Sequence, residues 1–309
     1  MNLLALDDVA VQLTMILGTM MAMVLGIICL QTKSSSAGTF LPNPILEPSK
    51  YAYENFVMWY SPVWMSAMAL IIIFQLYEQF DAACYNGVLG GLALPLVLQP
   101  LIWPLGPDRK KFWWERYSSK ANLWIAIYSF IGNYWYTQYF YSVLKAEYTM
   151  PATRLNNVPI AMTFATHFYF SSYHFFSNAL LRKIETRYRS GPIRTLLFVT
   201  VLLVFSYFTA FMETLTISAF PYYSFEDRDM AYTVGSAFYG IYFIVSFPAF
   251  YYFETGIDNT NNKRKTTTLW DVFISSCGYG MVILCLLDFV RLWLKIPLVV
   301  EISIGTSTQ

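Results

Sequence analysis

The sequence predicts an all-α protein, a polytopic transmembrane helical bundle with about seven or eight spans. Of its 309 residues, 56% are hydrophobic and only 13% are charged, whereas a soluble domain usually carries about 25% charged residues. The apolar residues are gathered into long runs, most of which reach the ~20 residues that cross a bilayer. The predicted spans cover approximately residues 9–30, 56–77, 83–105, 121–144, 158–181, 195–219, 231–253 and 270–294.

The N-terminal fifty residues differ from the rest of the chain. The first span follows Asp7 and Asp8 and has no basic stretch before it, which favours a retained anchor helix over a cleaved signal peptide. Residues 31–50 are rich in Ser, Pro and Gly and read as a flexible linker. We therefore expect an anchor helix with its linker over residues 1–50 and a transmembrane domain over residues 51–309.

Loop charges predict the orientation in the membrane. Lys and Arg are concentrated in the loops after the third, fifth and seventh spans, and the alternate loops contain few of them. By the positive-inside rule the basic loops are cytoplasmic, which places both termini on the opposite side. The net charge is +1, and the chain has no long basic face, so nucleic acid is not expected as a partner.

Only two histidines occur in the chain, and both lie in the fifth predicted span. They are seven residues apart, about two helical turns, so they share one face of a helix. Small polar side chains fall on the same face. The complete polar stripe is Thr163, His167, Ser171, His174 and Asn178.

The next span carries a carboxylate, Glu213, near its C-terminal end. A charged side chain at the centre of a membrane helix costs about 2.5–3.5 kcal/mol even on lenient scales, and such residues usually serve function. A position near the membrane surface would lower this cost. Burial disfavours the charged forms of carboxyl and imidazole groups, which leaves a neutral acid and a neutral base suited to proton transfer.

Other polar residues allow a structural interpretation. Asp288 and Arg291 are spaced i, i+3 in the last span and are expected to form an ion pair. Ser and Thr in the spans commonly join helices by hydrogen bonds. The chain has no nucleotide-binding or zinc-protease motif, and two histidines at this spacing do not ligate one ion without other help, so we expect no metal.

Several blocks of sequence, in order, resemble cycloeucalenol cycloisomerases, the cyclopropyl sterol isomerases of plants and algae. The likeness extends over approximately residues 55–294. It is carried by the blocks KANLWIAIYSFIGNYWYTQYFYSVL, YTMPATRLNNVP, THFYFSSYHFFSNALLRK and SYFTAFMETLTISAFPYYSFEDRDMAYTVGSAFYGIYFIVSFP, at residues 120–144, 148–159, 166–183 and 206–248.

The resemblance implies a cofactor-free isomerase of sterol biosynthesis in the endoplasmic reticulum membrane. Such an enzyme opens the 9β,19-cyclopropane ring of a 4α-methyl sterol such as cycloeucalenol and gives an 8-ene sterol such as obtusifoliol. An acid protonates C19, a cation develops at C9, and a base removes the proton on C8. Aromatic rings stabilise such a cation by about 2 kcal/mol when it is desolvated.

The residues suggest roles for this reaction. We expect Glu213 to be the proton donor and His174 and His167 to be base and relay, although the opposite assignment of acid and base fits the sequence equally well. The expected partners are the sterol and membrane lipid. The predicted substrate-binding residues are Asn133, Asn178, Tyr134, Trp135 and Tyr239.

Two other functions fit the same pattern of spans. One is a sterol Δ8–Δ7 isomerase of the emopamil-binding kind, which also transfers protons without a cofactor. The other is a sterol-binding or transport protein without catalysis, which would retain its ligand unchanged. Conversion of a 9,19-cyclopropyl sterol separates the first interpretation from both.

Overall fold

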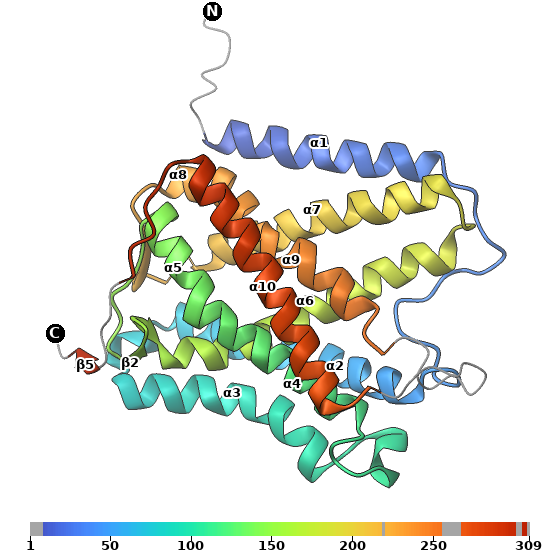
Figure 1. Ribbon diagram of the computed structural model, residues 1–309, viewed down its shortest axis with the longest axis horizontal. Helices are drawn as coiled ribbons and strands as arrows, with labels where there is room; N and C mark the ends of the chain where they lie inside the picture. The colour runs from blue at the N-terminus through green and yellow to red at the C-terminus, as the bar shows by residue number, and fades with distance from the viewer. Residues whose placement is uncertain (1–8, 218–219, 255–266, 301–304, 308–309) are drawn as a thin grey trace, which may run out of the picture.

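A computed structural model describes residues 9–217, 220–254, 267–300 and 305–307. It confirms the predicted all-α fold (Figure 1). The long helices are α1 (Val9–Cys29), α2 (Pro48–Ile73), α3 (Ala82–Ile102), α4 (Tyr117–Ile131), α6 (Ile160–Arg187), α7 (Pro192–Ile217), α9 (Ser236–Tyr251) and α10 (Leu269–Trp293). The short helices are α5 (Thr137–Tyr139) and α8 (Arg228–Met230), with the 3₁₀ turns η1 (Leu76–Gln79) and η2 (Gly106–Lys110). Three π-helical turns are η3 (Gly132–Tyr136), η4 (Phe140–Leu144) and η5 (Ala231–Gly235). The strands are β1 (Ala146–Tyr148), β2 (Ala152–Leu155), β3 (Val158–Pro159), β4 (Tyr223–Phe225) and β5 (Gly305–Ser307).

Each predicted span corresponds to a helical segment. Six described segments are long and apolar enough to cross a membrane, namely α1, α2, α3, α7, the segment 228–251 and α10. The fourth and fifth predicted spans are also helical, as α4–η4 and α6, but they carry more polar residues. The chain is thus a multi-pass membrane protein.

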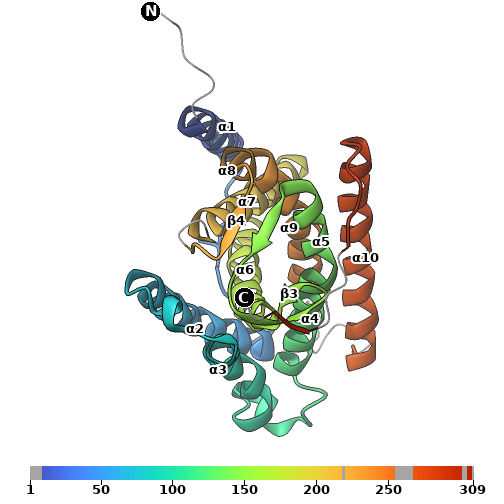
Figure 2. The ribbon, with the colours of Figure 1, turned by 90° about the vertical axis from the view of Figure 1, so that its left-hand side faces the viewer.

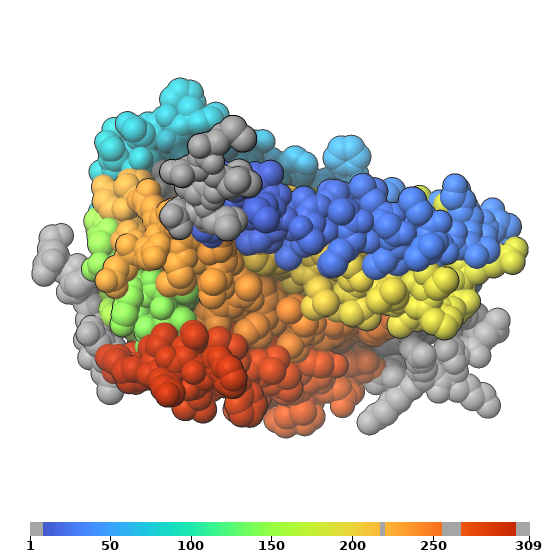
Figure 3. Space-filling view, turned by 90° about the horizontal axis from the view of Figure 1, so that it is seen from above, coloured from blue at the N-terminus to red at the C-terminus, as the bar shows by residue number. Residues whose placement is uncertain are grey.

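Helix α6 lies in the middle of the bundle. Figure 2 shows α2 and α3 on one side of it, α4 and α5 on another, and α7 and α9 above it. Neighbouring helices therefore cover α6 on most sides, which lets it carry polar residues that lipid would exclude. Helices α1 and α10 lie at the outside, and α1 runs along α7 (Figure 3). No described residue of α1 is buried.

Helix α2 begins at Pro48, eight residues before the predicted start at 56. Its first two turns include Lys50 and Glu54. Charged residues lower the hydropathy of these turns, so the sequence predicted a later start of the span. Both side chains are buried and are paired within the protein. Residues far away in the sequence therefore provide partners for these two charges, and α2 extends beyond the apolar run.

The segment expected to be a flexible linker is bound along the C-terminal end of α6. Backbone amides of Ser34 and Thr39 donate to the Arg187 carbonyl (2.8 Å) and to the Thr186 hydroxyl (2.9 Å). The Lys183 ammonium donates to the carbonyls of Ala37 (2.9 Å) and Gly38 (3.0 Å). These bonds fix the path of the chain between α1 and α2.

The strands close the end of the bundle opposite the basic loops. β2 pairs with β3 through the two-residue turn Asn156–Asn157, and both residues have positive φ angles of 53° and 61°. Asn tolerates this conformation, which the tight hairpin turn requires. β1 pairs with β4, and Tyr148 lies directly opposite Tyr223. These loops form one border of the candidate site.

Helix α10 approaches α4 closely at Gly280. A Cβ atom there would lie 2.8 Å from Cδ1 of Ile131 and 3.3 Å from the hydroxyl of Tyr136, which donates to the Gly280 carbonyl (3.1 Å). We expect Gly280→Ala to lower the free energy of unfolding by about 1 kcal/mol relative to Gly278→Ala through overpacking, since Cδ1 is the end of a flexible side chain; thermal unfolding in detergent measures the difference. Gly278→Ala is the matched control, because nothing lies within 4 Å of its Cβ position. Equal losses in the two variants would contradict this close packing.

Candidate active site

Glu213 lies in the last turns of α7 and its side chain faces the interior of the bundle. The residue is 8% exposed, and no described residue forms a hydrogen bond with its Oε2 atom. The hydroxyls of Tyr173 on α6 and Tyr239 on α9 face the carboxyl group. A buried carboxyl group with an unused oxygen is energetically costly, which makes Glu213 a candidate site residue.

A small cavity of about 60 Å³ adjoins Glu213. The residues around it come from the π-helical turns η3 and η4, from α5, α6, α7 and α9, and from β1 and β4. They are Gly132, Asn133, Thr137, Phe140, Leu144, Tyr148, Thr166, Phe170, Glu213, Thr214, Tyr223, Phe225, Tyr239 and Tyr242. Three predicted site residues, Glu213, Asn133 and Tyr239, are thus brought together around one cavity.

The cavity is smaller than a drug-sized ligand. A water molecule takes about 30 Å³ in the liquid, whereas ligand pockets are usually about 300 Å³ or more. A large ligand therefore requires the lining helices to separate. The two π-helical turns on the α4–α5 side interrupt the regular helical bonding, and such turns often occur at functional sites.

Asn133 is held in a fixed orientation. Its amide nitrogen donates to the Ser129 carbonyl (2.8 Å) and to the Thr166 hydroxyl (2.8 Å). Thr166 in turn donates to the Met162 carbonyl one turn earlier on α6 (3.0 Å). The amide thus joins α4 to α6 at the rim of the cavity.

Aromatic rings form much of the wall beside the carboxyl group. Tyr239 and Tyr242 pack edge to face with centroids 4.8 Å apart, and Phe140 lies 5.2 Å from Tyr239 and 5.6 Å from Tyr242. The faces of such rings attract cations. A carboxyl group and several aromatic rings therefore share one buried space.

The structure places the two histidines away from this cavity. The Nδ1 atom of His174 donates to the Phe170 carbonyl (2.7 Å), so its Nε2 accepts from the Ser246 hydroxyl (3.0 Å). His167 donates from Nε2 to Oδ1 of Asn122 (3.1 Å). The ring of His174 is enclosed by Trp124, Tyr128, Phe170, Phe247 and Phe250. Neither histidine lines the cavity.

The other predicted site residues are also elsewhere. Asn178 donates to Oε1 of Glu54 (3.0 Å) at the basic-loop end of the bundle. Trp135 is 43% exposed on the outer surface, and Tyr134 is half-buried, with its carbonyl accepting from Asn156 (2.7 Å). None of the three lines the cavity.

Sequence reasoning missed the buried ion pair between Glu54 and Arg182. The guanidinium donates to both carboxylate oxygens at 2.8 Å, and Glu54 is fully buried. The sequence signal was weak, because Glu54 precedes the predicted second span and Arg182 follows the fifth. The sequence shows that the two charges are opposite, but it does not show that the two side chains lie close together in the fold.

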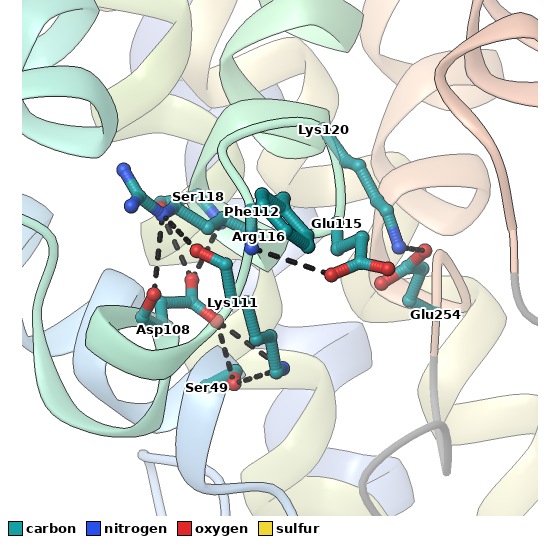
Figure 4. Close-up of polar contacts among 9 residues, drawn as sticks. All are labelled: Ser49, Asp108, Lys111, Phe112, Glu115, Arg116, Ser118, Lys120 and Glu254. Carbon is teal, nitrogen blue, oxygen red and sulfur yellow. Dashed lines mark hydrogen bonds and ion pairs between the residues drawn. The ribbon is translucent and has the colours of Figure 1, made fainter.

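More buried charges gather at the same end of the bundle (Figure 4). Asp108 accepts from the hydroxyls of Ser49 (2.9 Å) and Ser118 (3.1 Å), and Lys111 lies 3.2 Å from it. Lys120 pairs with Glu254 at 2.9 Å. These contacts join η2 to the first turns of α2 and α4, and α4 to the residues that follow α9. We assign this cluster to the stability of the bundle.

The molecule is a multi-pass helical membrane protein with a buried carboxyl group beside an aromatic-walled cavity. The chain is 38% identical over 268 residues to cycloeucalenol cycloisomerase of Arabidopsis thaliana, and the match covers 84% of this chain and 91% of that protein. The chain therefore belongs to the cycloeucalenol cycloisomerase family and is an isomerase. No family model and no solved structure matches it.

Proposed function

We propose that this isomerase opens the 9β,19-cyclopropane ring of a 4α-methyl sterol of the cycloeucalenol type and gives an 8-ene sterol of the obtusifoliol type. The observation that carries this proposal is the Glu213 carboxyl group, whose unpartnered oxygen is buried beside an aromatic-walled cavity. The family relationship supplies the substrate class. The proposed location is the endoplasmic reticulum membrane, where the sterol is reached from the lipid phase.

In the first step Glu213 transfers its proton to C19. The electrons of the C9–C19 bond form the new C–H bond, C19 becomes a methyl group, and C9 becomes a tertiary cation. Tyr239, Tyr242 and Phe140 present their rings around this space and stabilise the cation. Enclosure among these helices keeps water from intercepting it.

In the second step C8 loses a proton, and the electrons of that C–H bond form the C8–C9 double bond. We propose that the Glu213 carboxylate takes this proton, because neither histidine lines the cavity. Their side chains form hydrogen bonds with Asn122 and Ser246 instead. The reaction then needs no net proton and no cofactor. Asn133, which is fixed between α4 and α6, orients the sterol or the carboxyl group.

The sterol requires the cavity to widen. We propose that η3 and η4 move apart from α7 and α9 when the substrate enters, because two π-helical turns lie on one wall. The transmembrane unit over residues 51–309 contains all of the cavity residues. Residues 1–50 serve as an anchor helix with its connecting segment.

Conversion assays test the proposal. The purified protein in lipid vesicles receives either cycloeucalenol or a sterol with an 8-ene bond, and chromatography separates products of unchanged mass. Formation of obtusifoliol from cycloeucalenol is the expected result. Conversion of the 8-ene sterol alone would instead indicate a sterol Δ8–Δ7 isomerase, and binding without conversion would remove the isomerisation proposed here.

A further inference from the structure

A hollow with a polar lining lies at the end of the bundle next to the Glu213 cavity. It has a volume of about 650 Å³ and contains the charged residues Lys145, Glu147 and Arg154. It is bordered by β1, by the β2–β3 turn and by the last turn of η4. Charged side chains of both signs keep such a hollow in contact with water.

One residue, Tyr148, lines both the hollow and the Glu213 cavity. Its ring stacks on that of Tyr223, with centroids 4.2 Å apart and an interplanar angle of 21°. Tyr223 lines the Glu213 cavity. The two residues are opposed in the β1–β4 pairing, so backbone hydrogen bonding fixes this pair of rings as the wall between the two spaces.

Tyr148, Tyr223 and Glu213 line the same small cavity, so the pair of rings adjoins the space that the carboxyl group faces. On the water side, Tyr141 lines the hollow and its hydroxyl donates to the Asn157 carbonyl (3.0 Å). Burial raises the pKa of Tyr148 and of Tyr223 well above the usual value of a phenol. Both hydroxyls therefore stay neutral, and each can accept one proton while it donates another.

We propose that Tyr148 and Tyr223 form the route by which the Glu213 carboxyl group exchanges its proton with water in the hollow. This inference rests on the proposed function. In each turnover Glu213 gives a proton to C19 and receives the proton from C8. The carboxyl group therefore ends the cycle with a hydrogen that came from the substrate. Exchange through the two phenols replaces it with a hydrogen of the solvent.

Deuterium labelling tests the route. The vesicle-bound protein converts an excess of unlabelled cycloeucalenol in D2O over many turnovers, and mass spectrometry measures deuterium in the C19 methyl group. We expect nearly every product molecule of the wild type to carry deuterium. A positioned hydroxyl speeds proton transfer by about 10²-fold or more, so Tyr148→Phe should lower the deuterium content by about threefold or more. The deuterium content is taken per product molecule formed, so a slower turnover caused by the place of Tyr148 in the cavity lining does not change the comparison.

Tyr60→Phe is the matched control, since that hydroxyl donates to the Leu92 carbonyl (2.6 Å) on the α2–α3 side of the molecule. It should keep the wild-type deuterium content. Tyr223→Phe repeats the test should Tyr148→Phe not fold. Full deuteration in a folded, active variant would overturn the route, and so would complete loss of turnover. No product from the wild type in ordinary water would instead count against the proposed function.

Discussion

Glu213→Gln is expected to remove isomerisation while the protein stays folded. Glutamine has almost the same shape but no acidic proton, and a positioned acid or base contributes about 10²–10⁴-fold to the rate. We therefore expect kcat for ring opening to fall by about 10²-fold or more. Turnover of cycloeucalenol in vesicles measures this loss, and thermal unfolding measures whether the bundle is intact. Glutamine also matches the neutral, protonated carboxyl group in charge, so the variant should unfold close to the wild-type temperature.

His174→Ala is the comparison variant for this experiment. Both ring nitrogens of His174 have partners inside the protein, and five aromatic rings surround it. Its loss should lower the free energy of unfolding by about 3 kcal/mol, as for other large buried side chains, and leave kcat of the folded protein nearly unchanged. Wild-type turnover in Glu213→Gln would remove the carboxyl group from the mechanism. A kcat loss in His174→Ala as large as that in Glu213→Gln would place the imidazole in the proton path.

Breaking the Glu54–Arg182 ion pair is expected to have the largest effect on stability. Glu54 accepts from Arg182 through both oxygens and from Asn178 through one of them. Glu54→Gln leaves a guanidinium buried without its carboxylate, and removing one partner of a buried pair costs about 3–5 kcal/mol. Thermal unfolding in detergent should show this loss.

The Asp288–Arg291 pair on α10 provides the matched control. Sequence spacing predicted this ion pair, and the structure confirms it with a contact of 2.6 Å. The Asp288 side chain is 34% exposed, compared with 1% for Glu54, and exposed pairs contribute about 1 kcal/mol or less. Asp288→Asn should therefore cost much less than Glu54→Gln. Equal losses in the two variants would show that burial does not decide the strength of these pairs.

The spans and the interior position of Glu213 could be predicted from sequence because both follow from the cost of polar groups in lipid. The partner of a polar residue could not. His167 and His174 share a helix face with Asn178, yet Asn122, Ser246 and Glu54 contact them separately. A shared face predicts a shared partner only where one neighbour covers it. Helix α6 is surrounded by several helices, so each turn of its polar stripe meets a different one.

The residues that line the cavity could not all be predicted from sequence, because the backbone between residues 132 and 144 is not a regular α-helix. A regular helix over residues 121–144 predicts which side chains face inward, but the π-helical turns η3 and η4 change that order. Asn133 therefore lines the cavity, whereas Trp135 faces outward. The pairing of Glu54 with Arg182 spans 128 positions, and no local pattern reveals such a contact.

The depth of Glu213 has a consequence for substrate traffic. The carboxyl group is four residues before the end of α7, roughly 6 Å along the helix axis, whereas the hydrocarbon layer is about 30 Å thick. Under the proposed function, and with α7 crossing the hydrocarbon layer, ring opening takes place within one leaflet, on the side of the strands β1 and β4. Substrate supplied to that monolayer reacts without flipping, and substrate in the other monolayer waits for transbilayer movement.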